Sequence, residues 1–533
     1  MQKSKNMKRT LSTIIFILFS CVSFAQQIDW LHSDSIGYSA NPALPKYRTT
    51  KFEKGVVLAR LNGLRQLYGI DILGNFNLER FDSLGNKLWT AELRGKVQVN
   101  TVITDLSNNL YVAGVFMETM DINSIDTLNN TGVAFNENSF LLSFDSNGNF
   151  RWKRNLSIAD QDIESVTTLS KDNNGEVWYC IQKFTSNTFV HIDTNGNDLN
   201  NYLIDGSRLC SSFSFDSNGN LFISGATESG MITVNGYSEV VSESYMMFVT
   251  RIDYLGHTSW IRLAHDITFQ EPQIVCSKNG EAFVAGNVFD STSWQGINFP
   301  RIFFGSSFFI AKVDSLGNFI WGRSISASDT GNFTIGSGRF IDVDEEGSVY
   351  MTGSQVGKIH YSPQLIVNTG IPASYNHVVV KYDNLGNAIW ERHGGNSYGN
   401  YVAEISVTGI NKGVLSSGIV GEAIYDSLST NQTGVQAALL VHFNDSVNMS
   451  VTVAEVNNDR NLFYPNPFNN QIFFNKNIEV NNPTIFSEEG FIVLFEKKLD
   501  DRFLKQLSSL SSGIYFFRGE QNGRIITNKI IKQ

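Results

Sequence analysis

A single short motif in the chain has the spacing of a serine nucleophile. Gly395-Asn396-Ser397-Tyr398-Gly399 follows the Gly-x-Ser-x-Gly pattern, in which a sharp turn between a parallel strand and a helix exposes the serine hydroxyl. Residues 401–407 alternate between apolar and polar side chains, which predicts a strand in place of that helix. We therefore interpret the motif as a loop, and the sequence predicts no catalytic residues.

Two acidic segments loosely follow the pattern of a calcium-binding loop. They are Asp342-Val343-Asp344-Glu345-Glu346-Gly347 and, more faintly, Asp172-Asn173-Asn174-Gly175. Calcium loops need several spaced oxygen ligands and a downstream bidentate glutamate, and neither segment has the full set. The eight histidines are scattered, without the paired spacing of a zinc site. No cofactor or metal site is predicted, and structural calcium remains a minor alternative.

Cysteine usage excludes a disulfide scaffold, because the chain has only four cysteines. Cys21 lies in an N-terminal segment that we expect to be removed, which leaves Cys180, Cys210 and Cys276. An odd number means that at least one is free or intermolecular. Cys180 and Cys276 lie in apolar, strand-like runs, so we expect buried thiols.

The elements that would position any functional residue follow an internal repeat. Phe81-Asp82-Ser83-Leu84-Gly85-Asn86-Lys87-Leu88-Trp89 recurs at intervals of about 60 residues. The complete copies contain Asp82, Gly85 and Trp89; Asp145, Gly148 and Trp152; Asp253, Gly256 and Trp260; Asp314, Gly317 and Trp321; and Asp383, Gly386 and Trp390. A copy without tryptophan begins at Asp193, and a decayed copy is Phe443-Asn444-Asp445.

This frame predicts a tight hairpin. The aspartate can accept hydrogen bonds from the backbone of the turn, and the glycine supplies a left-handed conformation. The spacing suits a type I turn with a glycine bulge between two antiparallel strands. We expect the tryptophan on each returning strand to pack between neighbouring repeats, where its burial contributes roughly 2–3 kcal/mol.

A second series of short apolar runs alternates with these hairpins. Its copies are residues 108–114, 174–180, 219–225, 280–286, 347–353 and 412–418, and residues 54–59 open the set. Most copies end in glycine, which permits close approach of a neighbouring strand. We expect these runs to be the innermost strands of the repeat.

Two hairpins per repeat make four strands, which is one blade of a β-propeller. The fold class is therefore all-β, with a seven-bladed propeller of four-stranded blades over residues 50–455 and an N-terminal extension over residues 26–49. The pattern resembles the seven-bladed β-propeller (SBBP-type) repeat family of exported bacterial proteins, which has no shared catalytic residues. The alternatives are an open β-solenoid, two β-sandwiches and a quinoprotein dehydrogenase propeller. The repeats of quinoprotein dehydrogenases usually have Thr-Gly where this chain has Leu-Gly or Asn-Gly.

The N-terminus has the organisation of a secretory signal peptide. Four lysines and arginines precede an apolar run over residues 11–19, and Ser23-Phe24-Ala25 supplies small residues before a cleavage site between Ala25 and Gln26. We therefore expect residues 1–25 to be removed after recognition by the Sec translocon. A loose lipobox that ends at Cys21 is the alternative, although Phe19 fits that motif poorly.

The composition changes after residue 455. Residues 456–460 are a polar linker, and strand-like runs separated by turn residues then predict a small β-sandwich (Ig-like) over residues 461–533. Asn522-Gly523 is a strong hairpin signal within it.

Four motifs in this segment occur in a defined order. They are Tyr464-Pro465-Asn466-Pro467, a middle part of two strand-like runs around Gly490, the run Leu510-x-x-Gly513-Ile514-Tyr515, and a terminal Lys529-Ile530-Ile531-Lys532. The segment resembles the type A C-terminal sorting domain of type IX secretion cargo. That resemblance implies recognition by the outer-membrane translocon, cleavage near the linker, and release or sortase-dependent attachment to the surface of a Gram-negative bacterium.

Charge and composition limit the classes of partner. The chain of 533 residues has a formal net charge of −10, which argues against non-specific nucleic-acid binding. The sequence favours a secreted or cell-surface, non-enzymatic binding or scaffold protein, whose ligand is a glycan or another extracellular polymer by analogy of location. The alternative is a secreted hydrolase with carboxylates on propeller loops. A facing carboxylate pair at the channel mouth would favour the hydrolase. A smooth aromatic groove would favour the binding protein.

Overall fold

The computed structural model divides into two compact units, residues 1–446 and 447–533, each of which is described by itself. No helix in the described ranges has both the length and the apolar character needed to cross a membrane. The described residues are 27–35, 47–52, 55–67, 71–130, 137–158, 165–228, 230–243, 246–264, 272–288, 291–300, 307–325, 329–335, 338–369, 376–395, 400–420, 423–425, 428–430, 436–444, 463–474, 480–487, 492–521 and 524–533.

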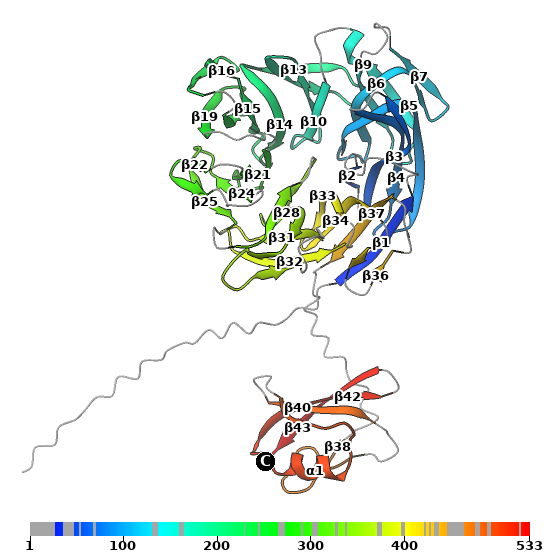
Figure 1. The fold of residues 1–533 in the computed structure, drawn as a ribbon, viewed down its shortest axis with the longest axis vertical. Coiled ribbons are helices and arrows are strands. Elements are labelled where there is room, and N and C mark those ends of the chain that lie inside the picture. Colours follow the sequence, from blue (N-terminus) through cyan, green and yellow to red (C-terminus); the bar gives the residue numbers. More distant parts are fainter. Residues whose placement is uncertain are drawn as a thin grey trace, which may run out of the picture. The chain divides into compact units, whose positions relative to one another are not determined.

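The larger unit consists of antiparallel strands that pair in sequence order, and we name each run of four a meander. Figure 1 shows their sheets around a common centre. The first meander is β2 (Tyr47–Phe52), β3 (Gly55–Leu67), β4 (Asp71–Phe81) and the first half of β5 (Lys87–Thr104). The second is the rest of β5, β6 (Leu110–Ile122), β8 (Asn138–Phe144) and β9 (Phe150–Asn155), with β7 (Asp126–Asn129) beside β6 and a 3-10 turn at Leu156–Ile158.

The next three meanders repeat this order. The third is β10 (Ser165–Lys171), β11 (Val177–Gln182), β12 (Ser186–Ile192) and β13 (Asp198–Asp205). The fourth is β14 (Ser207–Phe215), β15 (Leu221–Thr227), β18 (Met247–Ile252) and β19 (Thr258–Ala264). The fifth is β20 (Gln273–Cys276), β21 (Ala282–Val288), β24 (Ser307–Val313) and β25 (Phe319–Ser324).

The last two meanders bring the ends of this unit together. The sixth is β26 (Asn332–Ile335) and β27 (Ile341–Val343) in the first position, then β28 (Val349–Val356), β31 (Asn376–Tyr382) and β32 (Ala388–Gly394). The seventh is β33 (Asn400–Gly409), β34 (Lys412–Val420), β37 (Gln436–Asn444) and β1 (Gln27–Ser35). Short accessory hairpins are β16 (Gly230–Val234) with β17 (Tyr237–Val241), β22 (Thr292–Trp294) with β23 (Ile297–Phe299), β29 (Lys358–His360) with β30 (Ile366–Asn368), and β35 (Ile424–Tyr425) with β36 (Leu428–Ser429).

Strand β1 therefore pairs with β37, more than 400 residues later in the chain. Its residue Ile28 is buried in the same cluster as Phe443. The repeat pattern does not predict this strand, because residues 26–49 contain no Asp-x-x-Gly turn. The segment that the sequence analysis describes as an N-terminal extension thus supplies an outer strand.

The turns between third and fourth strands have the predicted geometry. In Asp314–Asn318, Oδ1 of Asp314 accepts from the backbone N–H groups of Leu316 (2.9 Å) and Asn318 (2.8 Å). Gly317 has φ +82°, a conformation that glycine adopts without steric cost. The other copies have the same positive-φ glycine, at Gly85, Gly148, Gly196, Gly256 and Gly386.

At four repeats the tryptophan contacts the turn of the next meander through both its indole N–H and its ring. The indole N–H of Trp321 donates to the carbonyl of Asn384 (3.1 Å), and a Cβ on Gly386 would lie 2.6 Å from the Trp321 ring. The same contact joins Trp89 to Ser146 and Gly148, Trp152 to Thr194 and Gly196, and Trp260 to Ser315 and Gly317. The expected packing between neighbouring repeats is confirmed at these four positions.

An arginine two residues after the tryptophan strengthens three of these contacts, and the sequence analysis missed it. The guanidinium of Arg323 donates to the carbonyl of Gly386 (2.8 Å) and lies 5.4 Å from the Trp321 ring centroid. Arg154 and Arg262 donate in the same way to Gly196 and Gly317. The signal was available as a Trp-x-Arg spacing at residues 152–154, 260–262, 321–323 and 390–392.

The expectation that the glycine-ended apolar runs are innermost is wrong. They form the second strands β6, β15, β21, β28 and β34. The strands β15 and β28 and the first seven residues of β6 are almost all buried, because neighbouring sheets cover both faces. The glycines do permit close approach: a Cβ on Gly114 would lie 1.9 Å from the carbonyl oxygen of Gln98 in β5.

The smaller unit has a four-stranded sheet in the order β41 (Ile492–Phe495), β40 (Asn481–Ser487), β42 (Gly513–Gln521) and β43 (Arg524–Lys532). Strands β38 (Phe463–Tyr464) and β39 (Phe473–Phe474) form a second pair, and α1 (Asp501–Ser508) packs Phe503 and Leu507 into the core. The sequence analysis expected only strands here. Asp500 caps the helix by accepting from the N–H groups of Arg502 and Phe503, which is a local N-cap signal.

Candidate functional site at the centre of the larger unit

The first strands of all the meanders line one cavity of about 660 Å³. We call it the central cavity. Its wall is formed mainly by residues within 48–49 of β2, 98–103 of β5, 165–171 of β10, 209–214 of β14 and 273–275 of β20, by Gly338, Arg339, Asp342 and Val343 at β27, and by Glu404 of β33. Val115, Glu137 and Gln182 complete it. Most of these side chains are hydroxyls, amides and charges, which suits a polar ligand better than an apolar one.

Polar side chains in the cavity wall join one first strand to the next. Asn100 Nδ2 donates to the carbonyl of Val166 (3.1 Å), and the Thr167 hydroxyl donates to that of Cys210 (3.1 Å). The Ser212 hydroxyl donates in the same way to Ile274 (3.1 Å). These residues therefore have a structural role as well as a place in the wall.

Glu404 is the most deeply buried acid of the cavity. Its carboxylate accepts from the backbone N–H groups of Thr49 (2.9 Å) and Arg339 (3.3 Å) and pairs with Arg48 Nη1 (3.0 Å). Burial raises the pKa of Glu404, and the Arg48 charge only partly opposes that rise. The carboxylate thus joins the seventh meander to the first and the sixth.

Asp342 connects the sixth meander to the seventh in a comparable way. Its Oδ2 accepts from the backbone N–H of Val407 (2.8 Å), and its Oδ1 accepts from that of Val343 (2.9 Å). Burial raises the pKa of Asp342, and the nearby Arg339 charge opposes that rise. Glu404 and Asp342 are both engaged by backbone amides, so neither is poised as a free general acid or base. The third acid of the wall, Glu137, has an exposed side chain.

Cations from opposite parts of the wall share this space. Lys171 Nζ donates to the carbonyl of Thr104 (2.9 Å). Burial lowers the pKa of Lys171, and the charges of Arg339 and Lys51 lower it further. The Arg339 guanidinium has no hydrogen bond or ion pair with any residue that the structure describes. Its side chain is half-buried in the cavity wall, and its charge acts on Asp342 and Glu404.

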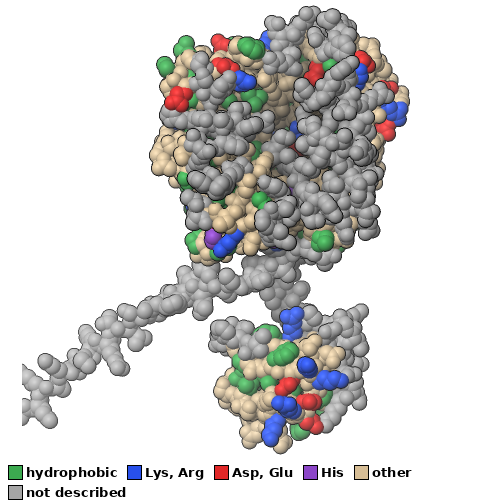
Figure 2. Space-filling model, viewed as in Figure 1, with side chains coloured by type: hydrophobic (Ala, Val, Ile, Leu, Met, Phe, Trp, Pro, Cys, Tyr) green, Lys and Arg blue, Asp and Glu red, His purple; other side chains and the backbone are tan. Residues whose placement is uncertain are grey.

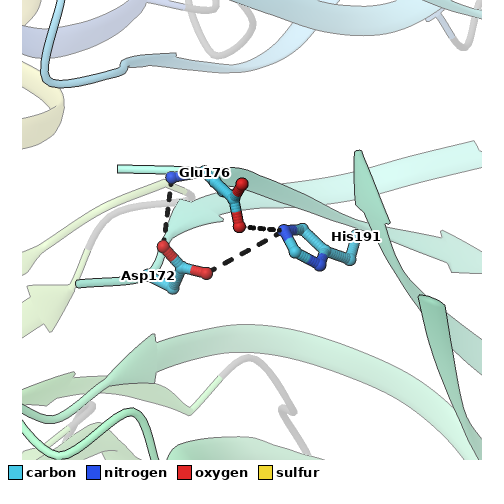
Figure 3. Close-up of side chains that lie close together, drawn as sticks. All are labelled: Asp172, Glu176 and His191. Carbon is cyan, nitrogen blue, oxygen red and sulfur yellow. Dashed lines mark hydrogen bonds and ion pairs between the residues drawn. The ribbon is translucent and has the colours of Figure 1, made fainter. Parts of the chain in front are cut away.

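One cluster outside the cavity has the residue types of a metal site. His191 Nε2 lies 2.9 Å from Glu176 Oε2 and 3.9 Å from Asp172 Oδ2 (Figure 3). In the described part of the chain it is the one group of three such ligands. The Trp178 ring stacks on His191, with 4.5 Å between the ring centroids.

The repeat gives this cluster a structural explanation. His191 lies two residues before a turn aspartate, and Lys312 and Lys381 occupy the same position in later repeats. Lys312 pairs with Glu281 (2.7 Å) and Lys381 pairs with Asp344 (3.1 Å). The cluster is therefore the third meander's copy of a repeated pair between a base on the third strand and an acid of the preceding turn.

The segments with a calcium-like pattern also lie in these turns. Asp344 Oδ1 accepts from the N–H groups of Glu346 (3.0 Å) and Ser348 (2.9 Å), and its Oδ2 accepts from the Tyr350 hydroxyl (2.8 Å). Asp172 Oδ1 accepts from the N–H groups of Asn174 and Glu176. Protein donors thus occupy the carboxylates that a calcium ion would need.

Of the serine motif, only Gly395 is among the described residues. Gly395 exchanges backbone hydrogen bonds with Ile424, whereas residues 396–399 lie outside the described ranges. Residues 400–409 form β33, the strand that the sequence predicts after the motif. A nucleophile elbow requires a helix at that place.

In the smaller unit the motifs at its two ends come together. Asn466 Nδ2 donates to the carbonyl of Lys529 (2.5 Å), and Asn466 Oδ1 accepts from the N–H of Ile531 (2.8 Å). Lys532 Nζ donates to the carbonyls of Ser508 and Leu510. The Gly513-Ile514-Tyr515 motif lies beside the terminal one, because its residues pair with Lys532, Ile531 and Ile530. Tyr464 is half exposed and Lys529 is exposed.

Other features of the sequence analysis lie outside the described residues. They are the signal peptide with Ala25 and Gln26, Cys21, the linker 456–460 and the Asn522-Gly523 hairpin. Cys180, Cys210 and Cys276 are buried thiols, as expected.

Comparison with solved structures gives low overall similarity. A protein of unknown function from Bacteroides caccae is 14% identical with a TM-score of 0.30, over 52% of this chain and 82% of that chain. A luciferin-regenerating enzyme is 10% identical with a TM-score of 0.32, over 68% and 98%. Porphyromonas gingivalis dipeptidyl peptidase 4 is 10% identical with a TM-score of 0.30, over 74% and 59%.

No curated protein matches the chain at a significant level. A family model matches its C-terminal part, and the match covers all described residues of the smaller unit. Such a domain indicates a protein exported by type IX secretion to the surface or exterior of a Bacteroidetes-type Gram-negative cell. Residues 462–533 are a secretion system C-terminal sorting domain of the type IX pathway.

Proposed function

We propose that the larger unit is a seven-bladed β-propeller, closed by β1, that binds a polar extracellular ligand in its central cavity without transforming it. Each meander corresponds to one blade, and the pairing of β1 with β37 supplies the outer strand of the last blade. In a ring of blades, the first strands face the centre. The shared lining of the central cavity supports that arrangement.

The observation that carries the binding function is the chemistry of the cavity wall. Hydroxyl and amide groups are frequent in it, and the Arg339 guanidinium, which lies in the same wall, carries a positive charge. Such a wall can hydrogen-bond the hydroxyls of a sugar and pair with an acidic substituent. We therefore propose a glycan or another extracellular polymer as the ligand.

Figure 2 shows the described side chains on one face of the larger unit. On that face of the larger unit, hydrophobic side chains form small separate patches and charges of both signs are scattered. A large contiguous apolar patch would instead indicate a protein partner.

A secreted hydrolase with carboxylates on propeller loops is the alternative. Glu404 and Asp342 are the two acids of the cavity that are engaged by backbone amides, and they lie in or beside strands. An aromatic groove is not a feature of the cavity wall either, in which Phe213 is the one aromatic residue. The engaged carboxylates favour binding over hydrolysis.

The route of export completes the proposal. Residues 1–25 act as a signal peptide for the Sec translocon and are cleaved between Ala25 and Gln26. The sorting domain then engages the type IX machinery, and a sortase removes it near residues 456–460. The propeller is released or remains on the cell surface.

A binding array tests the function. The secreted protein is applied to glycans and extracellular polymers, and the supernatant of each positive sample is examined by mass spectrometry for cleavage products. We expect retention on polar, hydroxyl-rich polymers without products. Products in the supernatant would favour the hydrolase, and retention on none of the polymers would contradict the binding function.

A further inference from the structure

Two of the three described cysteines lie close together between the third and fourth meanders. Cys180 on β11 and Cys210 on β14 are fully buried in the same hydrophobic cluster. On β10, Thr168 is directly opposite Cys180, and the hydroxyl of the adjacent Thr167 donates to the carbonyl of Cys210 (3.1 Å). The two cysteines thus approach each other across the edge of one strand.

One side-chain amide, that of Asn187, contacts both cysteines. The Cys180 thiol donates to Asn187 Oδ1 (3.8 Å), and the backbone N–H of Cys210 donates to the same oxygen (3.4 Å). Asn187 Nδ2 donates to the Ser207 hydroxyl (2.9 Å), which in turn lies 4.0 Å from Cys210 Sγ. Burial raises the pKa of the Cys210 thiol well above its usual value, and the neighbouring Cys180 thiol raises it further.

Cys276 has a different environment. Its thiol contacts the carbonyl of Ser214 (3.5 Å), and its side chain belongs to the cluster between the fourth and fifth meanders. The geometry therefore separates the cysteines into a neighbouring pair and a single thiol.

We propose that Cys180 and Cys210 are an oxidation site, and that they form an intramolecular disulfide while the chain passes through the periplasm. Disulfides form in that compartment, and the sorting domain indicates an exported protein. A disulfide needs Cα atoms within about 7 Å and facing Cβ atoms, which neighbouring positions on two packed strands can provide. In the structure both residues are thiols.

The chemistry is thiol–disulfide exchange with a protein disulfide oxidant. The thiolate of one cysteine attacks the oxidant's disulfide, forms a mixed disulfide and displaces one thiolate of the oxidant. The second cysteine, as its thiolate, attacks the mixed disulfide and displaces the other. The two cysteines lose two electrons and two protons, and the oxidant becomes a dithiol. Because both sulfurs are buried in the folded unit, the exchange precedes the packing of the third sheet against the fourth.

Alkylation of the full chain after secretion tests this site. The protein is quenched in acid, denatured, treated with N-ethylmaleimide, digested and analysed by mass spectrometry, with and without reduction. We expect Cys276 to be alkylated in both samples, and Cys180 and Cys210 only after reduction, with one linked peptide pair in the unreduced sample. Alkylation of all three without reduction, or a disulfide that includes Cys276, would overturn the proposal.

Two matched variants and one change of compartment complete the experiment. Cys276→Ser is expected to keep the linked pair, whereas Cys210→Ser exposes Cys180 to alkylation without reduction. The same chain held in the cytoplasm by deletion of residues 1–25 is expected to have three alkylated thiols. A linked pair in that cytoplasmic protein would contradict the dependence on export.

Discussion

Glycine and tryptophan at the turns illustrate how single residues determine the packing of this protein. Gly386 has φ +81° and would place an added Cβ 2.6 Å from the Trp321 ring, whereas Gly236 has φ +91° and no heavy atom within 4 Å of that position. Both glycines avoid backbone strain, but only Gly386 also makes room for a neighbouring sheet.

The pair Gly386→Ala and Gly236→Ala separates these two contributions. Gly236→Ala is expected to cost about 1 kcal/mol of unfolding free energy from backbone strain alone. Gly386→Ala adds the displacement of a buried ring, so its cost is expected to be about 2–4 kcal/mol. Urea denaturation of the secreted protein measures both; equal losses would mean that the tryptophan contact does not constrain the glycine.

Two buried glutamates have pKa shifts of opposite sign. Burial alone would raise the pKa of Glu79, but hydrogen bonds from Arg60 and Lys87 outweigh that effect and hold the pKa below its ordinary value of 4.5. Glu79 therefore contributes stability that is present above about pH 4.5 and is lost as the pH falls through its folded pKa. The pKa of Glu404 is raised, so the dependence has the opposite sign. The contribution of Glu404 to stability is present below its ordinary pKa of 4.5 and is lost as the pH rises through its folded pKa.

The variants Glu79→Gln and Glu404→Gln test these signs. Glu79→Gln is expected to lower stability at pH 7 by about 3 kcal/mol, because it leaves buried Arg60 without its charged partner, and to flatten the loss of stability in acid. Glu404→Gln is expected to remove a loss of stability that sets in as the pH rises above about 4.5. Denaturation curves at several pH values provide the measurement, and parallel pH profiles for wild type and both variants would contradict the assigned shifts.

At the scale of elements, the sequence predicted what is local and missed what depends on long-range packing. The turns were predictable because aspartate and glycine determine them within five residues. The first strands were not, because they line a polar cavity and contain serine and threonine in place of apolar residues, as in Ser165–Lys171. The central cavity itself brings together Arg48, Lys171, Arg339 and Glu404, whose proximity no sequence spacing reveals.

Strand β1 is the element with the largest consequence for closure. Ile28 is buried and Asp29 pairs with His442 (3.1 Å). Ile28→Asp is expected to cost about 3 kcal/mol or more, because it buries a carboxylate without a partner. Ser33→Asp, on a half-buried position of the same strand, is the control with a smaller loss. Thermal unfolding of the two variants distinguishes them, and equal midpoints would indicate that β1 is not part of the folded sheet.

At the scale of the whole molecule, the two units have separate tasks. Asn466 fastens the first sorting motif to the last strand through Lys529 and Ile531. Residues 447–533 fused to an exported fluorescent protein are therefore expected to bring it across the outer membrane, and Asn466→Ala in that fusion is expected to reduce the exported fraction. Cell fractionation measures both; periplasmic retention of the unmodified fusion would contradict the assignment of the signal to this unit.

The proposed function of the larger unit depends on ligand binding in the central cavity. Arg339 faces that cavity, whereas Arg208 is a half-exposed side chain that pairs with Glu228 on the surface. The decisive measurement is calorimetric titration of a polymer retained on the array into wild type, Arg339→Gln and Arg208→Gln. The proposal predicts a loss of affinity of about tenfold or more for Arg339→Gln, the equivalent of roughly 1.4 kcal/mol, and none for Arg208→Gln. Unchanged affinity in Arg339→Gln would contradict binding in the cavity.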